Sequence, residues 1–405
     1  MKTQEQRNKE QTMQYILKNK DEVVLEFEVE KESEIFEGQT ISHFSLKNAF
    51  VINANLLPKQ ISQSNLLSSL ESWIKHRKVP QHREFSENIL ASLPTSSENN
   101  LMAYIDISFG LSLNDSFWVT PSDKNYKWKD YNLYDNAFSE ALELSAFGLN
   151  LTEVNGFTSS PEYTTNGMLK KCWHRENGEI YLYKGSTQEY ANGGKEAYSE
   201  YYMAQIAEIM EFDYVPYDLK LFHNQIVSTC PIFTNENEGY MPIHYLLKES
   251  PKNYDKITLM MEISNNIYGK ESFRDLMLFD ALICNIDRHL GNFGMIVDNN
   301  TGAILRPAPI FDNGFSMMTT LEKNQLSDIS KSLMKDISYF ELSFNKQLEL
   351  FAQVRHIPNL EKLSEFTFKR HKEFNLGEEW LQPIESHIQQ RAKMALGFIK
   401  EKERI

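Results

Sequence analysis

The stretch NIDRHLGN, residues 285–292, places a carboxylate at Asp287 and an amide at Asn292, five positions later. Phosphoryl transfer needs a carboxylate that orients the attacking hydroxyl and accepts its proton, and it needs oxygen ligands for Mg²⁺. A short loop with this spacing can aim both side chains at one phosphate group. The stretch therefore predicts the catalytic loop of an ATP- and Mg²⁺-dependent phosphotransferase, although an Asp-Arg-His run can also form a structural salt-bridge corner.

A second acidic stretch follows downstream, where IFDNG, residues 310–314, ends a strand-like run. A carboxylate at Asp312 can bind a metal, and Gly314 permits a sharp backbone turn. Taken alone, an Asp-Asn-Gly sequence is more often an ordinary turn. Together with residues 285–292 it predicts a second metal ligand.

A lysine and a glutamate upstream complete the expected set. Lys184 ends the strand-like run 179–184, and Glu200 lies on the helix expected next, where Glu196 is an alternative. A lysine in this position can reach the ATP phosphates if a carboxylate holds it. The order Lys184, Glu200, catalytic Asp, Asn and metal-binding Asp is the order of the parts in protein kinases.

The pattern around these residues predicts an α+β, two-lobed, protein-kinase-like fold. A β-rich N-lobe is expected at residues 146–238 and a mostly helical C-lobe at residues 239–405. Asn177-Gly178 is a strong signal for a tight hairpin. The expected elements are strands 168–173, 179–184, 217–222 and 226–233, a helix 195–210, and a hairpin of 293–297 with 303–310.

Residues 1–145 are expected to form an additional mixed α/β domain whose role the sequence does not indicate. Strands are expected at 22–30 and 44–53, a helix at 66–77, and a strand-like segment at 101–113. Two segments of this domain each allow two interpretations. The basic segment 73–83 is either a partner-binding surface or a solvated helix end, and the aromatic segment 111–118 is either a docking edge or core.

Composition excludes several classes of protein. The net charge of −14 disfavours a general nucleic-acid-binding surface and docking on anionic membranes. The three cysteines lie far apart and show no zinc-ligand spacing, which fits a reducing compartment. The polar N-terminus has no apolar signal core, and no run of about 18 apolar residues occurs, so we expect a cytoplasmic protein.

At four stretches the sequence resembles the HipA-type serine/threonine kinases, relatives of the phosphoinositide kinases. The stretches are residues 164–173, YLYKG at 181–185, NIDRHLGN at 285–292 and APIFDNG at 308–314. The resemblance covers roughly residues 150–320 and is most specific in the last two stretches.

The resemblance implies a role for each matched residue. Asp287 would be the catalytic base, Asn292 and Asp312 the Mg²⁺ ligands, and Lys184 the residue on the ATP phosphates. Ile232 and Phe233, within CPIF at 230–233, fall where the family contacts adenine. The implied function is an ATP- and Mg²⁺-dependent kinase of a protein substrate, with a toxin or regulatory role and an antitoxin-type partner.

The sequence departs from the family in the loop before Lys184. No G-x-G-x-x-G motif occurs there, and the loop FTSSPEYTT at 157–165 lacks the family's glycine-alanine-glutamine pattern. Family members carry a serine in this loop, and its phosphorylation can eject the loop and disable the enzyme. We therefore hypothesise autophosphorylation at Ser159 or Ser160, with a plain polar loop as the alternative.

Two other functions fit the same residues. The first is a small-molecule or lipid kinase, because the D-x-x-x-x-N spacing is shared among kinase-like folds. The second is a nucleotide-binding pseudokinase that serves as an interaction module. The presence of every expected catalytic residue type argues against the second.

Overall fold

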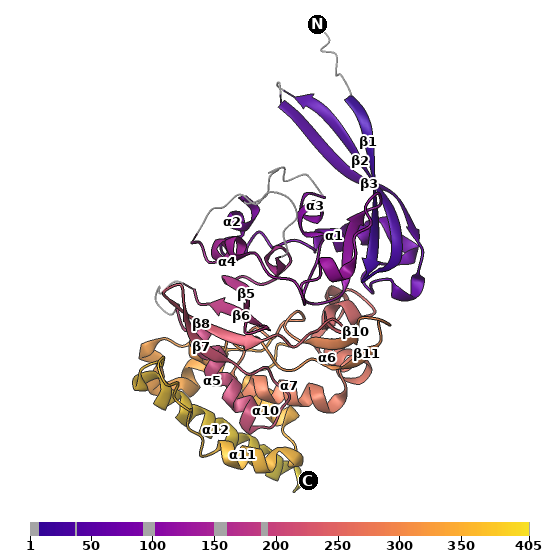
Figure 1. The fold of residues 1–405 in the computed structure, drawn as a ribbon. Helices are drawn as coiled ribbons and strands as arrows, with labels where there is room; N and C mark the ends of the chain where they lie inside the picture. The colour runs from indigo at the N-terminus through magenta and orange to yellow at the C-terminus, as the bar shows by residue number, and fades with distance from the viewer. Residues whose placement is uncertain (1–7, 37–38, 92–101, 150–159, 188–192, 405) are drawn as a thin grey trace. The chain divides into compact units, whose positions relative to one another are not determined.

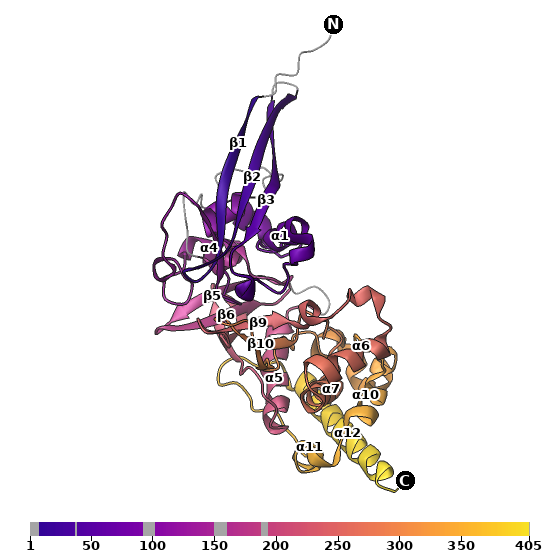
Figure 2. The same ribbon diagram turned by 90° about the vertical axis from the view of Figure 1, so that its right-hand side faces the viewer.

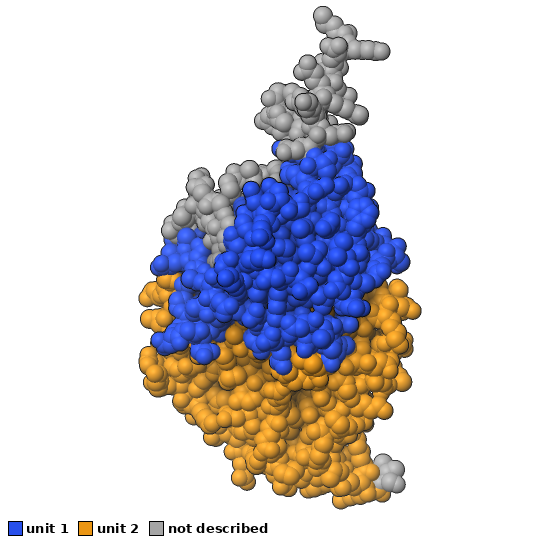
Figure 3. Space-filling model, turned by 45° about the vertical axis from the view of Figure 1, so that its right-hand side comes forward, with its two compact units in different colours: residues 1–180, 234–239, 297–304 blue, residues 181–233, 240–296, 305–405 orange. Residues whose placement is uncertain are grey.

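The computed structural model describes residues 8–36, 39–91, 102–149, 160–187 and 193–404. By its internal contacts the chain forms two compact units, shown in blue and orange in Figure 3. Unit 1 comprises residues 1–180, 234–239 and 297–304, and unit 2 comprises residues 181–233, 240–296 and 305–405. The domain limits expected from the sequence, near residues 145 and 238, do not coincide with the limits of these two units. They describe a different division of the chain and stay a prediction.

Unit 1 is built on a four-stranded antiparallel sheet, in which β1–β3 are long neighbouring strands (Figures 1 and 2). Its order is β3-β2-β1-β4, with β1 Asn8–Asn19, β2 Glu22–Phe36, β3 Gln39–Val51 and β4 Phe117–Pro121. Along β2, Leu25, Phe27 and Val29 are buried while the glutamates between them face outward. This period of two residues lets one face of the sheet pack on α1.

Four short helices and one further strand complete the regular elements of unit 1. They are α1 Leu66–Lys75, α2 Ser86–Ala91, α3 Ala103–Ser108, α4 Glu140–Ala146 and β5 Lys171–Glu176. The expectation of a strand within residues 101–113 was wrong, because α3 occupies that segment. Met102, Ile105 and Phe109 are all buried at helical spacing, and this packing prevails over the alternation of residues 105, 107 and 109.

The β-rich part of unit 2 follows the order expected from the sequence. The sheet order is β5-β6-β8-β7, with β6 Glu179–Gly185, β7 Asp218–Phe222 and β8 Gln225–Pro231, and the unit boundary falls within β6. Asn177 and Gly178 have φ of 52° and 89°, as a two-residue turn with left-handed backbone requires. Helix α5, Glu196–Ile209, connects β6 to β7 and β8.

The rest of unit 2 is mostly helical, as expected. Its helices are α6 Lys256–Glu262, α7 Lys270–Ile283, α8 Met317–Thr320, α9 Ile329–Ser332, α10 Phe344–Phe351, α11 Ile357–Leu363 and α12 Glu378–Lys402. A small sheet, β11-β10-β9, contains β9 Glu238–Pro242, β10 Gly294–Asp298 and β11 Ile304–Pro307.

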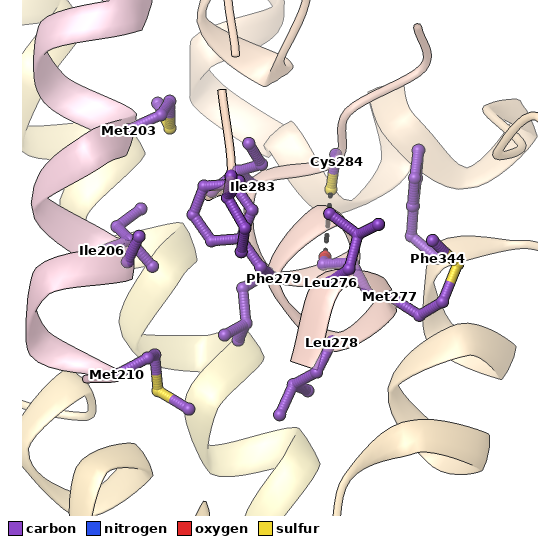
Figure 4. Close-up of a cluster of buried hydrophobic side chains, with 14 of the residues drawn as sticks. Met203, Ile206, Met210, Leu276, Met277, Leu278, Phe279, Ile283, Cys284 and Phe344 are labelled. Carbon is purple, nitrogen blue, oxygen red and sulfur yellow. Dashed lines mark hydrogen bonds between the residues drawn. The ribbon is translucent and has the colours of Figure 1, made fainter. Parts of the chain in front are cut away.

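The core of unit 2 includes the apolar side chains between α5 and α7. Met203, Ile206 and Met210 of α5 point toward the apolar side chains of α7, which include Phe279 and Ile283 (Figure 4). Burial of these side chains fixes α7, and the helix ends directly before residues 285–292. Among the described residues, none of the helices combines the length and the apolar character that crossing a bilayer requires.

Candidate active site

Lys184 lies at the end of β6 with its ammonium group between two carboxylates. Its Nζ donates to Glu200 Oε1 at 2.7 Å and also to Asp312 Oδ1. Burial by itself would lower the pKa of Lys184, but the charges of Asp312 and Glu200 outweigh it and the pKa is raised. The lysine therefore stays protonated in a site where it is only 8% exposed.

Glu200, rather than Glu196, is the residue that holds the lysine. Glu200 is fully buried on α5, and its second oxygen accepts the backbone N–H of Asn313 at 2.7 Å. Glu196, one turn earlier, instead accepts the hydroxyl of Thr187 at 2.7 Å. Glu200 thus connects Lys184 with the chain segment that carries Asp312.

The loop after α7 brings Asp287 and Asn292 together. Cys284 ends the helix with a left-handed backbone, φ 52°, and reverses the direction of the chain. The side chain of Asn285 then accepts the N–H of Asp287 at 2.9 Å, and Asn292 Nδ2 donates to the Asp287 carbonyl at 2.9 Å. The two residues predicted from their spacing are therefore held on one short loop.

The carboxylate of Asp287 lies in the electrostatic field of the other site residues. Burial raises the pKa of Asp287, and the negative charge of Asp312 raises it further. His289 and Lys184 act in the opposite direction and lower this pKa. His289 is exposed, and its Nδ1 accepts the N–H of Gly291 at 3.0 Å.

The segment around Asp312 corrects one detail of the sequence analysis. The left-handed residue of the turn is Asp312 itself, with φ 57°, and Gly314 is absent from the positive-φ residues. Gly314 instead lies close to the ion pair, because a Cβ there would make a tight contact of 3.3 Å with Glu200 Oε1 and lie 3.7 Å from Lys184 Nζ. The glycine leaves room for the Lys184–Glu200 pair.

Arg288 is a site residue that the sequence analysis missed. It is 1% exposed, and its Nε lies 3.1 Å from each carboxylate oxygen of Asp280 on α7. Its Nη1 donates to the carbonyl groups of Asn292, at 2.9 Å, and Phe311. Its Nη2 donates to Asn313 Oδ1 at 2.9 Å. The available signal was Asp280 itself, a charged residue within the apolar run 276–283 of a helix.

The two residues expected to contact adenine lie just after β8, and both are half-buried. The ring of Phe233 lies 5.3 Å from that of Phe311 and 5.6 Å from that of Tyr240. The Tyr240 hydroxyl donates to the Gly291 carbonyl at 2.9 Å, so this aromatic cluster contacts the catalytic loop. Ile232 has no ring and takes no part in this aromatic cluster. Contact of Ile232 or Phe233 with adenine stays a prediction.

The donor set fits a nucleotide with a divalent cation. The Lys184 ammonium group contacts two carboxylates, those of Glu200 and Asp312, and the charge of Arg288 is balanced by Asp280. No cluster of three or more His, Cys, Asp or Glu side chains suited to a metal occurs in the part of the chain that the structure describes. Mg²⁺ commonly uses one or two protein ligands together with phosphate oxygens and water, which Asp312 and Asn292 could provide.

The remaining predicted residues belong to unit 1. Ser159 lies outside the described residues. Ser160 is 2% exposed, and its hydroxyl accepts the N–H of Glu162 at 3.3 Å at the start of a short 3₁₀ helix. Its hydroxyl is therefore engaged in this conformation, and autophosphorylation stays a prediction.

The structure bears on the two segments with alternative interpretations through their buried residues. Arg77 is paired with Asp115 at 2.5 Å, and Arg83 is paired with Glu162 at 3.2 Å. Both arginines are buried, so they add no exposed basic surface to residues 73–83. Trp118 is fully buried, which favours the interpretation of residues 111–118 as core.

Comparison with known proteins identifies the fold. No protein-family model matches the chain. No curated protein matches its sequence. The crystal structure of the Helicobacter pylori proinflammatory kinase CtkA is 20% identical, covers 60% of this chain and 95% of its own, and has a TM-score of 0.47. HipA of Shewanella oneidensis MR-1, solved with HipB and its operator DNA, is 13% identical and has a TM-score of 0.54.

The similarity to HipA covers 96% of this chain and 99% of the HipA chain. It shows that the chain has the HipA-type fold, an α+β kinase-like fold with a β-rich lobe, a helical lobe and an additional N-terminal part. The resemblance that the sequence motifs indicated is confirmed at the level of the fold.

Proposed function

We propose that this chain is an ATP- and Mg²⁺-dependent serine/threonine protein kinase of HipA type. The observation that carries the proposal is the position of the Lys184 ammonium group between Glu200 and Asp312, in the same unit as the loop after α7 that carries Asp287. Lys184, Asp312 and Asp287, the groups proposed to bind phosphate, to bind the metal and to act as the base, all belong to one compact unit.

The roles of the residues follow from their chemistry. Asp312 and Asn292 would hold Mg²⁺, and Lys184, oriented by Glu200, would bind phosphate oxygens of ATP. Bound Mg²⁺-ATP supplies the phosphoryl group and neutralises the charge of the transferred group. Asp287 orients the substrate hydroxyl and accepts its proton while the hydroxyl oxygen bonds to the γ-phosphorus and ADP leaves.

A regulatory partner is part of the proposal. The structurally similar HipA was solved in a complex with HipB and operator DNA. We propose that a protein of antitoxin type likewise controls this kinase, in the cytoplasm and in a toxin or regulatory role. The net charge of −14 supports contact with nucleic acid through such a partner, rather than by this chain directly.

The test is incubation of the purified chain with Mg²⁺ and γ-labelled ATP, alone and with added protein substrates. Asp287→Asn and Asp312→Ala are compared with Asp123→Asn, which changes an exposed carboxylate of unit 1. We expect label transfer by the wild type and by Asp123→Asn. Loss of the base should reduce transfer by at least ~100-fold while ATP binding remains.

The outcomes separate the proposed function from its alternatives. Unchanged transfer by Asp287→Asn would refute the assignment of the base. Nucleotide binding without transfer to any protein would favour the pseudokinase, and transfer only to a small molecule or lipid would favour that class of kinase. Mapping of phosphate within residues 157–165 tests autophosphorylation, and we expect Ser159 rather than the buried Ser160 if it occurs.

A further inference from the structure

Asp312 adopts a backbone conformation that is uncommon for residues other than glycine. With φ 57°, it lies in the left-handed region, which aspartate tolerates better than most residues because its short side chain can hydrogen-bond locally. Such residues persist where the surrounding structure holds them in place, and they are concentrated at functional sites. The contacts around Asp312 therefore indicate which residues direct its carboxylate.

One side of this segment is held by the connection between α5 and β7. Ile310 N–H donates to the Asp213 carbonyl at 2.8 Å, and Val215 N–H donates to the Ile310 carbonyl at 2.9 Å. Residues 214 and 310 pair as in a parallel bridge. The connection ends at Tyr217, whose hydroxyl oxygen accepts the backbone N–H of Asp312 at 3.1 Å.

The residues on either side of Asp312 are held by other groups. Arg288 donates to the carbonyl of Phe311, and Glu200 accepts the N–H of Asn313 at 2.7 Å. Arg288 thus holds the carbonyl oxygen of the peptide group between Phe311 and Asp312, and Glu200 holds the next peptide group. The N–H of the first of these peptide groups, that of Asp312, donates to the Tyr217 hydroxyl. The acceptor is a side chain, so it can be removed without changing the backbone that supports the segment.

We propose that Tyr217 is a positioning residue that holds Asp312 in its left-handed conformation and so presents the carboxylate to Mg²⁺. This inference rests on the proposed function, because it takes Asp312 as the metal ligand. Tyr217 itself would touch neither the metal nor the nucleotide. Burial raises the pKa of Tyr217 well above its usual value, and the charge of Glu200 raises it further, so the phenol remains neutral over the working pH range.

The proposal predicts a specific loss. Tyr217→Phe removes one hydroxyl oxygen and leaves the N–H of Asp312 without that acceptor, so the carboxylate is less well fixed. Partners that orient metal ligands typically change metal affinity by ~10–100-fold when mutated. We therefore expect at least ~10-fold weaker binding of the divalent cation by Tyr217→Phe, with little change in nucleotide binding in the absence of metal.

The measurement is titration of Mn²⁺ into the intact protein saturated with a non-hydrolysable ATP analogue, with free Mn²⁺ quantified by electron paramagnetic resonance. Nucleotide affinity in EDTA is measured separately by calorimetry. Tyr214→Phe is the matched control, since it removes a hydroxyl from the same connection while the backbone pairing with Ile310 stays. If Tyr217→Phe does not fold, Tyr217→Met, which also lacks the hydroxyl, takes its place.

The results distinguish failure of this inference from failure of the proposed function. Weaker Mn²⁺ binding by Tyr217→Phe, but not by Tyr214→Phe, would support the positioning role. Equal Mn²⁺ affinity for wild type and Tyr217→Phe would overturn it, while leaving the kinase assignment intact. Absence of nucleotide and Mn²⁺ binding in the wild type would overturn both.

Discussion

At the scale of single residues, Arg288 joins the parts of the site that carry the predicted chemistry. Its guanidinium group contacts Asp280 on α7, the Asn292 carbonyl on the loop 285–292, and Asn313 beside Asp312. A planar guanidinium group can serve several acceptors in fixed directions, which a lysine cannot do. Arg288 therefore sets the relative positions of the catalytic loop and the Asp312 segment.

Replacement of Arg288 by Ala should destabilise the protein and make its stability depend on pH. Removing one partner of a buried ion pair typically costs ~3–5 kcal/mol of unfolding free energy, because the other charge is left uncompensated. Burial already raises the pKa of Asp280, and Arg288 opposes that rise. Without Arg288 the pKa of Asp280 in the folded protein rises further above its value in the unfolded chain. The variant is therefore most stable at a pH below the unfolded-state pKa of Asp280, and it loses stability as the pH rises from there toward the folded-state pKa.

The measurement is urea-induced unfolding of wild type and Arg288→Ala at pH 5.5 and pH 8. We expect a larger deficit for the variant at pH 8 than at pH 5.5. As a control, the double variant Asp280→Leu/Arg288→Met removes both charges and should recover part of the loss. A deficit that is the same at both pH values would contradict the account of Asp280.

Residues whose type and spacing match a step of phosphoryl transfer could be proposed from the sequence. A residue that only positions other residues could not. Asp287 and Asn292 are recognisable because their types and spacing match phosphoryl transfer, and Lys184 because it ends a strand before a helix with Glu200. The role of Arg288 depends on Asn313 and Asp280, which lie 25 and 8 positions away. Nothing in the local sequence specifies which acceptors a buried guanidinium group will contact.

At the scale of elements, the hairpins around the site could be predicted because their turns are determined locally. Asn177 and Gly178, and then His223 and Asn224, have the left-handed backbone that a two-residue turn between strands requires. Segment 101–113 could not be assigned in the same way, since its apolar residues fit both strand and helix spacing. There the choice was made by burial of Met102 and Ile105 in the core of unit 1.

Two glycines provide a matched test of these element-level requirements. Gly178 has φ 89° and Gly397 has no positive φ, and an added Cβ at either position would meet no atom within 4 Å. Gly178→Ala should therefore cost ~1 kcal/mol of stability through backbone strain alone. Gly397→Ala, within α12, should stabilise by up to ~1 kcal/mol through helix propensity.

Urea-induced unfolding followed by circular dichroism measures both changes, with the wild type as reference. Gly178 lies in the turn at the opposite end of β6 from Lys184, and Gly397 lies in α12, so phosphoryl transfer should change little in either variant. Two substitutions with effects of the same sign would contradict the assignment, because only the backbone conformation distinguishes the sites.

At the scale of the whole molecule, the chain passes repeatedly between its two units. Unit 2 contains every predicted catalytic residue, but residues 234–239 and 297–304 interrupt it and belong to unit 1. Within unit 1, Asn19 Nδ2 donates to the Asn299 carbonyl at 2.6 Å, and Trp128 Nε1 donates to Glu236 Oε1 at 2.8 Å. Sequence analysis could not predict this division, because the partners are more than 100 positions apart along the chain.

Deletion of residues 1–165 should therefore impair nucleotide binding although every predicted catalytic residue is kept. The deletion removes Asn19 and Trp128, and with them the partners of both interrupting segments. These segments continue into β9 and β10, and β9 carries Tyr240, whose hydroxyl donates to Gly291 in the catalytic loop. We expect a lower melting temperature and weaker binding of the ATP analogue than in the full chain.

A single substitution tests the same argument without a deletion. Asn19 is buried, and it also accepts the Ser116 hydroxyl at 2.7 Å, so Asn19→Ala leaves two buried polar groups without a partner. Each such group costs ~1–3 kcal/mol. Hydrogen exchange in the 297–304 segment should accelerate in Asn19→Ala, while exchange in α12 should not. Wild-type nucleotide affinity in the truncated chain, or unchanged exchange in Asn19→Ala, would show that the catalytic part of the molecule does not depend on residues 1–165.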